Sequence, residues 1–183
     1  RRCRVINMFV NPENTISHLE LKPGMTAADF GCGAGFYTIP LAKAVRPNGK
    51  VYAFDIRKEM LEIVKSKARL ENLLNIEAVW ADLEINGSTK LRDETADAAI
   101  ISNILFQVDD KRALIKEAVR VLKKGGRAMI VEWDESAGIG GPLPAQRVRR
   151  EEAKRLFEEE KLIFAKEFNA GDQHYGLLFK KTQ

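Results

Sequence analysis

The sequence predicts an α/β fold in which a mainly parallel sheet carries helices on both faces. Strand-like and helix-like segments alternate along most of the 183 residues, as they do when helical crossovers join parallel strands. Residues 96–102 (ADAAIIS) are nearly all apolar, which is typical of a strand covered on both faces. The last two strand-like runs are separated only by residues 169–174. That leaves no room for a crossover helix, so we expect an antiparallel hairpin at one edge.

The first half of the chain supplies three of these strands. Residues 26–31 (TAADFG) read as a short buried strand that ends in a glycine loop, and residues 36–45 read as an apolar helix closed by the turn sequence RPNG. Residues 50–55 (KVYAFD) are rich in β-forming side chains and predict the second strand. In residues 57–71 apolar side chains recur at helical spacing between charges, and residues 76–81 (IEAVWA) predict the third strand.

The second half of the chain completes the sheet. After the apolar fourth strand, Asp109 or Asp110 can cap a helix that Gly125 and Gly126 end. The charges of the next helix alternate in sign, which favours a solvated face over a nucleic-acid stripe. We expect residues 138–144 (GIGGPLP) to be a mobile loop, either a lid or a connector. The elements expected here are helices at 110–123 and 148–161 and strands at 127–133, 162–168 and 175–180.

The composition limits the classes of protein that fit. A length of 183 residues suits one domain, and 45% hydrophobic with 31% charged residues is a globular profile. No uncharged apolar run approaches the roughly 18 residues of a membrane-spanning helix. No apolar segment follows the basic start at Arg1, Arg2 and Arg4, so we expect no secretory signal and a cytoplasmic location. Cys3 and Cys32 are too few for a disulfide framework, and the net charge of +4 does not by itself indicate nucleic acid.

The sequence DFGCGAG at residues 29–35 is the strongest local signal of a binding site. It follows a predicted strand and precedes a predicted helix, and Gly31, Gly33 and Gly35 allow a tight turn and close approach of a ligand to the backbone. The helix N-terminus behind the loop offers unpaired N–H groups. A dinucleotide fingerprint would need glycine where the chain has Phe36, so a dehydrogenase is a minor alternative. A glycine-rich turn without a ligand is the other alternative.

Polar residues follow the next three strands at their carboxyl ends, where ligands bind in sheets of this class. Asp55 ends the second strand and can accept hydrogen bonds from both hydroxyls of a ribose, with a helix cap as its alternative role. Asp82 ends the third strand and can accept from an adenine amino group while Leu83 packs on the ring, although such a residue alone is more often a loop acid. The sequence SNILF at 102–106 follows the fourth strand. Four such features in order indicate one nucleoside-binding edge.

With these motifs in place, the chain resembles the class I S-adenosylmethionine (SAM)-dependent methyltransferases from about residue 11 to residue 181. Within them it resembles the broad type 11 group, which includes ubiquinone and menaquinone biosynthesis enzymes. The pattern DxGxGxG at 29–35 matches the family's first motif, and LKKGGR at 122–127 resembles its LKPGG turn with lysine in place of proline. The resemblance implies a Rossmann-like sheet of seven strands in the order 3-2-1-4-5-7-6, with strand 7 antiparallel. It also implies an N-terminal segment at 1–21 that covers the cofactor mouth and a single SAM-binding domain at 22–183.

The resemblance further implies which residues bind the cofactor. The methionine part of SAM is expected against Asp29 and the glycine loop, and the adenosine part against the residues that end the second and third strands. Asn103 is expected near the reactive sulfonium, and Tyr37 either covers the cofactor or packs in the core. The product would be S-adenosyl-L-homocysteine (SAH). The expected contacts are Asp29, Gly31, Cys32, Gly33, Gly35, Tyr37, Asp55, Ile56, Asp82, Leu83 and Asn103.

The expected reaction is in-line methyl transfer. The sulfonium already activates the methyl group, so the protein mainly aligns an acceptor and excludes water. A general base is useful when the acceptor is a hydroxyl. Candidate bases are Asp134, which follows the fifth strand together with Glu135, and His174 at the start of the last strand, with His18 of the amphipathic segment 11–21 as a further candidate. The structural alternatives are a solvated loop acid and structural or exposed histidines.

A small molecule is the favoured acceptor, because the chain is short and shows no appended binding domain. Amino methylation of nucleobases or glutamine typically uses an Asn/Asp-Pro-Pro-aromatic motif after strand 4, where this chain has SNIL. Methylation at carbon 5 of a pyrimidine needs a cysteine nucleophile, and neither cysteine is placed for it. No Cys/His cluster indicates zinc, so no metal is expected. An acceptor in RNA or protein, or a SAM-binding scaffold without turnover, remain the alternatives, and the oligomeric state is not predicted.

Overall fold

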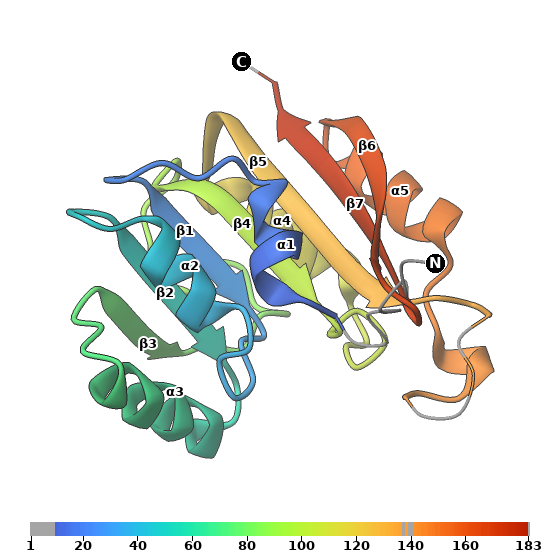
Figure 1. The fold of residues 1–183 in the computed structure, drawn as a ribbon. Helices are drawn as coiled ribbons and strands as arrows, with labels where there is room; N and C mark the ends of the chain where they lie inside the picture. The colour runs from blue at the N-terminus through green and yellow to red at the C-terminus, as the bar shows by residue number, and fades with distance from the viewer. Residues whose placement is uncertain (1–9, 137, 139–140, 183) are drawn as a thin grey trace, which may run out of the picture.

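The structure, a computed structural model, describes residues 10–136, 138 and 141–182. Seven strands form one sheet in the order β3-β2-β1-β4-β5-β7-β6 (Figure 1). Strands β1 to β5 are mutually parallel, and β7 runs antiparallel to both β5 and β6. The predicted Rossmann-like fold, its strand order and the antiparallel strand 7 are therefore confirmed. The strands are β1 Thr26–Phe30, β2 Lys50–Asp55, β3 Ile76–Trp80, β4 Ala96–Ser102, β5 Leu122–Trp133, β6 Leu162–Gly171 and β7 His174–Lys181.

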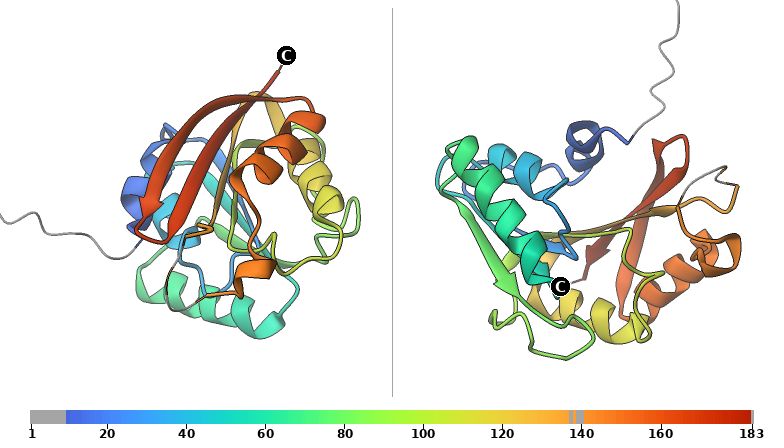
Figure 2. Two further views of the ribbon diagram at one scale, coloured as in Figure 1. Left: turned by 90° about the vertical axis from the view of Figure 1, so that its right-hand side faces the viewer. Right: turned by 90° about the horizontal axis from the view of Figure 1, so that it is seen from below.

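Helices cover both faces of the sheet, as predicted. Helices α1, α2 and α3 lie on one face, and α4 and α5 lie on the other (Figure 2). Successive residues of a strand point to opposite faces, so β4 buries Ile100 on the α1–α2 side and Ile101 on the α4–α5 side. The helices are α1 Pro12–Ser17, α2 Thr38–Ala44, α3 Lys58–Leu70, α4 Lys111–Val121 and α5 Arg150–Glu159, with a 3₁₀ turn at Pro144–Gln146.

Some predicted features fall outside the described residues. Cys3 and the arginines of the basic start belong to residues 1–9, and the loop expected at 138–144 is described only in part. Among the described residues, no helix is long and apolar enough to cross a membrane. No group of three or more His, Cys, Asp or Glu side chains in the described part of the chain is arranged to hold a metal ion.

The predicted boundary between α4 and β5 is wrong. Asp110 caps α4, and its side chain accepts a hydrogen bond from the N–H of Ala113 at 3.0 Å. The helix ends at Val121, however, and β5 begins at the next residue, which already pairs with β4. Gly125, with φ of 75°, lies in the stretch where the ladder is irregular before pairing resumes at Arg127. Strand pairing thus overrides the stop signal that the two glycines give in the sequence.

The final hairpin is longer than predicted. β6 continues to Gly171 and β7 begins at His174, so the turn contains only Asp172 and Gln173. The polar run before the turn reads as a loop in the sequence, yet Asn169 and Gly171 pair with β7. The pairing extends because neighbouring antiparallel strands exchange backbone hydrogen bonds whether their side chains are buried or exposed.

A buried acid anchors the connection between β3 and β4, whose residues 81–95 include no α-helix. Glu117 of α4 accepts hydrogen bonds from the N–H of Gly87 at 2.8 Å and from the hydroxyl of Thr89 at 2.5 Å. Arg120 donates to the same carboxylate at 2.9 and 2.7 Å. Burial alone would raise the pKa of Glu117, but the hydrogen bonds from Arg120, Thr89 and Gly87 outweigh burial and lower the pKa to about 2.

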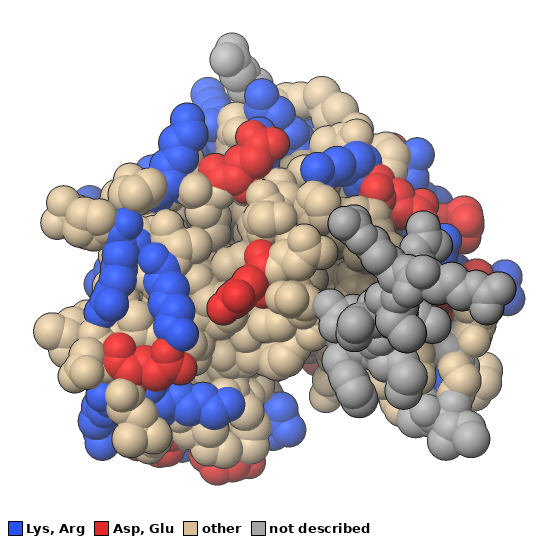
Figure 3. All heavy atoms as spheres, in the orientation of Figure 1, with Lys and Arg blue, Asp and Glu red and all other residues tan. Residues whose placement is uncertain are grey.

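Charges of both signs are interspersed on the face that carries α1, α2 and α3 (Figure 3). Lys43 of α2 pairs with Glu71 after α3, and Arg127 pairs with Glu20 at 2.6 Å. Paired charges of this kind leave little field to attract a polyanion. The described residues on this face therefore form no single-sign patch.

Candidate functional site

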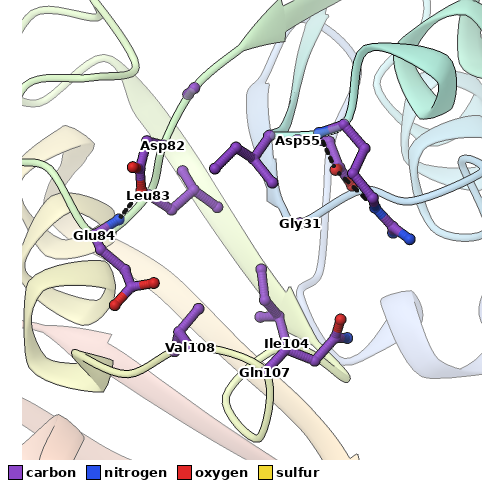
Figure 4. A pocket seen from close by; sticks show the side chains of 11 residues that line it. Gly31, Asp55, Asp82, Leu83, Glu84, Ile104, Gln107 and Val108 are labelled. Atoms are coloured by element: carbon purple, nitrogen blue, oxygen red, sulfur yellow. Dashed lines mark hydrogen bonds and ion pairs between the residues drawn. The ribbon is translucent and has the colours of Figure 1, made fainter.

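A cavity of about 270 Å³ lies at the carboxyl ends of β1, β2, β3 and β4. Figure 4 shows Asp82 and Glu84 on one side of it, Asp55 on the other, and Ile104 and Gln107 along a third wall. Parallel strands end at one edge of the sheet, so residues far apart in the sequence meet here. The predicted residues that line the cavity are Gly31, Asp55, Ile56, Asp82 and Leu83, and the others are Arg57, Ala81, Glu84, Ile104, Gln107 and Val108.

The glycine loop reaches the cavity at Gly31, where φ is +76°. A Cβ atom at this position would lie 2.3 Å from Cδ1 of Ile104, so only glycine permits this contact between the loops after β1 and β4. The N–H groups of Gly31 and Cys32 both donate to the carbonyl of Phe54 at 2.9 Å. Both N–H groups are thus already hydrogen-bonded within the protein. At Gly31 and Cys32 the loop lets a ligand come close to the backbone but provides no free N–H donor.

Asp55 connects the second strand to the glycine loop. Its Oδ2 accepts a hydrogen bond from the N–H of Gly33 at 2.9 Å, and its Oδ1 accepts from the N–H of Arg57 at 2.9 Å. Asp55 is not a side-chain cap of α3, which begins after Arg57 with no side-chain cap. An ionised carboxylate has about four acceptor positions, so Asp55 retains capacity for a ligand in the cavity that it lines.

The residues after β3 form the opposite side of the cavity. Oδ1 of Asp82 accepts a hydrogen bond from the N–H of Glu84 at 3.1 Å, and Oε2 of Glu84 accepts from the N–H of Asp110 at 2.6 Å. These bonds fix the turn that carries Leu83, whose side chain is buried. Leu83 and the half-exposed Ile56 give the cavity apolar walls next to its acidic groups, which suits a flat polar ring.

Asp29, from the first motif, lies in the protein interior and does not line the cavity. Its carboxyl accepts a hydrogen bond from the hydroxyl of Thr38 at 2.6 Å. Burial raises the pKa of Asp29 to about 7, with a smaller contribution from the charge of Asp55. Near neutral pH this group is therefore divided between its protonated and ionised forms.

Other predicted residues also lie outside the lining of the cavity. Cys32 is buried, and burial raises the pKa of its thiol. Tyr37 is buried, burial raises the pKa of its hydroxyl to about 12, and the hydroxyl has no hydrogen-bond partner among the described residues. Asn103 has φ of 52°, and its Oδ1 is buried and without a partner in the described part of the chain. Gly33 and Gly35 share positive φ values; the N–H of Gly33 donates to Asp55, and that of Gly35 donates to the carbonyl of Cys32 at 2.9 Å.

The structure places the candidate base Asp134 in an ion pair. Its Oδ1 accepts hydrogen bonds from the N–H and the hydroxyl of Ser136 at 2.9 and 2.7 Å, and Arg150 binds Oδ2. Burial alone would raise the pKa of Asp134, but the bonds from Ser136 and Arg150 outweigh it and lower the pKa below its ordinary value. A carboxylate held in this way is a poor proton acceptor.

The two histidines both pack against aromatic rings in a tilted arrangement. The ring centroid of His174 lies 4.3 Å from that of Trp133, and burial lowers the pKa of His174. Its Nε2 is buried and has no hydrogen-bond partner among the described residues. The ring of His18 lies 4.1 Å from Phe168, and burial, followed by the charge of Lys166, lowers its pKa. Both shifts favour the neutral form of the imidazole.

Sequence reasoning missed Glu132 at the end of β5. Its side chain is fully buried and accepts hydrogen bonds from the N–H groups of Ile104 and Leu105. An acid inside the apolar run AMIVEW is the signal that points to it. The apolar residue after SN at the end of β4 similarly points to Ile104, whereas nothing in the sequence marks Gln107 or Val108 as cavity residues.

Comparisons with known proteins agree with this geometry. A family model described as a methyltransferase domain matches residues 21–178. A demethylmenaquinone methyltransferase from Geobacillus sp. (strain WCH70) is 32% identical over 128 residues, which are 70% of this chain and 53% of that protein. Its counterpart in Bacillus mycoides (strain KBAB4) is 33% identical over 129 residues, with the same coverage. The chain thus spans about half the length of these curated relatives.

Solved structures give the same result over more of the chain. A SAM-dependent methyltransferase from Aquifex aeolicus is 27% identical, with a TM-score of 0.86, covering 95% of this chain and 90% of that one. A putative type 11 methyltransferase from Sulfolobus solfataricus is 28% identical, with a TM-score of 0.77, covering 94% and 93% of the two chains. The fold is therefore shared along nearly the whole length of these two proteins.

Proposed function

Because the chain belongs to the methyltransferase domain family and is a class I SAM-dependent methyltransferase, we propose that it transfers the methyl group of SAM to a small-molecule acceptor. The observation that carries the proposal is the cavity at the sheet edge, into which the ends of three strands bring Gly31, Asp55 and Asp82. Such an edge is where sheets of this kind bind nucleotides.

The residues present fit the adenosine part of SAM. Asp55 retains acceptor capacity for ribose hydroxyls, and Asp82 has a second carboxylate oxygen beside the one that accepts from Glu84. Ile56 and Leu83 supply apolar contacts for an adenine ring. For the methionine part we propose Asp29 and the glycine loop, with Asn103 and Tyr37 near the sulfonium. The unpartnered Asn103 Oδ1 supports this assignment, since buried polar atoms normally have partners.

When bound, SAM supplies a methyl group that its sulfonium already activates. The chain's own task is to orient the acceptor for in-line displacement and to keep water out. If the acceptor is a hydroxyl, we propose His174 and not Asp134 as the proton acceptor. His174 is neutral with an unpartnered Nε2, whereas Asp134 is engaged by Ser136 and Arg150.

For the acceptor we propose a small molecule, with hydroxylated or quinone-type rings as the first class to test. The support is the name of the curated relatives, demethylmenaquinone methyltransferase, together with the mixed charge of the surface in Figure 3. A nucleic-acid substrate would favour a coherent basic face. A cytoplasmic location stays part of this proposal.

The N-terminal segment 1–21 is proposed to cover the cofactor mouth of the domain at 22–183. In support, Ile16 and Leu19 share a hydrophobic core with Tyr37, which precedes α2, and with Leu41, which lies in α2. Thr15 also lies close to the hydroxyl of Tyr37. The described part of this segment thereby packs against the helix that follows the glycine loop.

Two measurements test the proposed function. Saturating SAH should raise the melting temperature whereas NADH should not, because a ligand at 100 times its Kd stabilises the folded state by about 2.7 kcal/mol. SAM with a labelled methyl group, offered with quinols, phenols, thiols, RNA and cell protein, should label a small molecule. Stabilisation by NADH alone would overturn the cofactor assignment. Label in RNA or protein only would overturn the acceptor class, and SAH binding without any labelled product would indicate a scaffold.

A further inference from the structure

A buried acid that does not line the cavity holds the loop that forms one wall of it. Glu132, at the end of β5, is 0% exposed. Its Oε1 accepts hydrogen bonds from two successive backbone N–H groups, those of Ile104 at 2.9 Å and Leu105 at 2.8 Å. Its Oε2 is buried and has no hydrogen-bond partner among the described residues. The carboxyl is therefore committed to the loop after β4.

The side chain of Glu132 accepts the backbone hydrogen bonds that follow the last bond of the β4–β5 ladder. The N–H of Asn103 still donates to the carbonyl of Val131 at 2.9 Å, as in a regular parallel ladder. At Asn103 φ becomes 52°, and the chain turns out of the sheet. Backbone carbonyls of β5 no longer meet the next two N–H groups, and the carboxyl of Glu132 supplies their acceptor.

The loop held in this way forms a wall of the cofactor cavity. Ile104, Gln107 and Val108 line the cavity, and the side chain of Gln107 donates to the carbonyl of Asn103 at 2.6 Å. Ile104 lies so close to Gly31 that no Cβ would fit between them. In close-packed surroundings a shift of Ile104 by a few tenths of an ångström changes the space at the glycine loop.

We infer that Glu132 is a positioning residue for cofactor binding: it holds Ile104 against Gly31 and thereby sets the wall of the cavity between the glycine loop and the loop after β4. The inference deepens the proposed function and rests on it, because the cavity is taken to be the SAM site. Glu132 acts through Ile104 and is not itself a contact of the cofactor.

The apolar environment of Glu132 makes an ionised acid unfavourable for folding stability at this position. On the same face of β5, Ala128 and Ile130 are apolar and belong to the core. Burial raises the pKa of Glu132 to about 7, partly offset by the N–H groups of Leu105 and Ile104. An apolar residue would pack here without that penalty, but it would leave two buried N–H groups without an acceptor.

The test compares Glu132→Gln with Glu132→Leu in the whole chain, with SAH as the probe in titration calorimetry. The glutamine carbonyl still accepts from both N–H groups, so its Kd for SAH should stay within about threefold of the wild type, whereas leucine should raise the Kd about tenfold or more. Ile130→Ala is the matched control, because it weakens the same face of β5 without removing the acceptor of the two N–H groups of the loop. It should lower the melting temperature and leave the Kd unchanged.

A double-mutant cycle separates positioning from general loss of structure. If Glu132 acts through Ile104, then Glu132→Leu should change the Kd far less in an Ile104→Ala background than in the wild type. Equal effects in the two backgrounds would overturn the inference. Should the leucine variant not fold, Glu132→Asp withdraws the carboxyl from the loop while keeping its charge, and it should raise the Kd at least about threefold. An unchanged Kd for that variant would also overturn it.

The outcome for the wild type distinguishes the two proposals. If the wild-type chain does not bind SAH, the proposed function fails and the inference falls with it. If the wild type binds SAH, and the leucine and aspartate variants bind it equally well, the inference alone fails.

Discussion

Cδ1 of Ile104 lies so close to Gly31 that a Cβ atom on Gly31 would be 2.3 Å from it. The contact joins residues from the ends of the neighbouring strands β1 and β4, and both residues line the cavity. The first prediction follows from it directly.

Gly31→Ala should abolish most SAH binding and destabilise the protein. The substitution adds the cost of a positive φ, about 1–2 kcal/mol, and forces Ile104 out of the way. Gly24→Ala is the matched control, since Gly24 also has positive φ and open space where its Cβ would be, but lies outside the glycine loop. Calorimetric titration with SAH and thermal unfolding measure both effects. Equal loss of affinity in the two variants would show that the contact with Ile104 is irrelevant.

Asp55→Asn should weaken SAH binding by roughly one to two orders of magnitude, because one amide group cannot accept from Gly33 and Arg57 on both sides as a carboxylate does. Glu62→Gln, on the exposed face of α3, serves as a control for the loss of one charge. The readout is the Kd for SAH at fixed ionic strength. If Asp55→Asn binds SAH like the wild type, Asp55 does not hold the ribose.

The stability of the chain should fall as pH rises from about 4 to about 7 through the contribution of Asp29. Its pKa is raised from 3.8 to about 7 in the folded state, so the folded state binds more protons than the unfolded state in this window. The contribution is fully present below the unfolded pKa and is lost as pH rises through the folded pKa. The slope is on the order of 1.4 kcal/mol per pH unit for one proton. Asp29→Asn should flatten that part of the urea-unfolding profile, and an unchanged slope would contradict the assignment.

Glu117→Gln should destabilise the protein by about 3–5 kcal/mol, because it breaks a buried ion pair with Arg120 and leaves the N–H of Gly87 with a poorer acceptor. The damage should be local first. Amide hydrogen exchange in residues 84–95 should accelerate more than in β4 or β5. Glu94→Gln, which loses only a long contact with Lys181, should change neither measurement appreciably.

If the acceptor is a hydroxyl, His174→Phe should lower kcat/KM by about 10²–10⁴-fold. Phenylalanine keeps the ring contact with Trp133 while removing the proton acceptor. The pKa of His174 lies below its ordinary value of 6.5, so the wild-type rate should fall on the acid side of that value as the imidazole becomes protonated. Asp134→Asn should keep that acid limb. A profile that loses its acid limb in Asp134→Asn and retains it in His174→Phe would reverse the two roles.

The cavity at the edge of the sheet was predictable because strand ends supply its residues. Asp55 and Asp82 end strands whose alternation with helices is plain in the sequence, and parallel pairing then brings them together. The role of Ile104 was not predictable, since it arises from a contact with Gly31 across the sheet. The end of α4 was misjudged for a similar reason: strand pairing of Leu122 with β4 decides it, and local glycine signals do not.

For the candidate bases, too, the sequence predicts position but not the contacts made with other elements. The sequence places Asp134 and His174 near strand ends, but only the tertiary structure surrounds Asp134 with Ser136 and Arg150. Whether a carboxylate is free or ion-paired depends on residues that approach from other elements. Position at a strand end therefore identifies candidates and does not rank them.

The place of β7 between β5 and β6 also bears on how the chain is made. β7 is synthesised after both of its neighbours, so the apolar edge of β5 stays bare until residues 174–181 have left the ribosome. By then β1 to β4, the glycine loop and the acids of the cavity have already emerged. A nascent chain can therefore carry every residue that lines the cavity before its sheet is complete. In that interval the open strand is exposed to wrong partners, and a ligand would meet an unfinished protein.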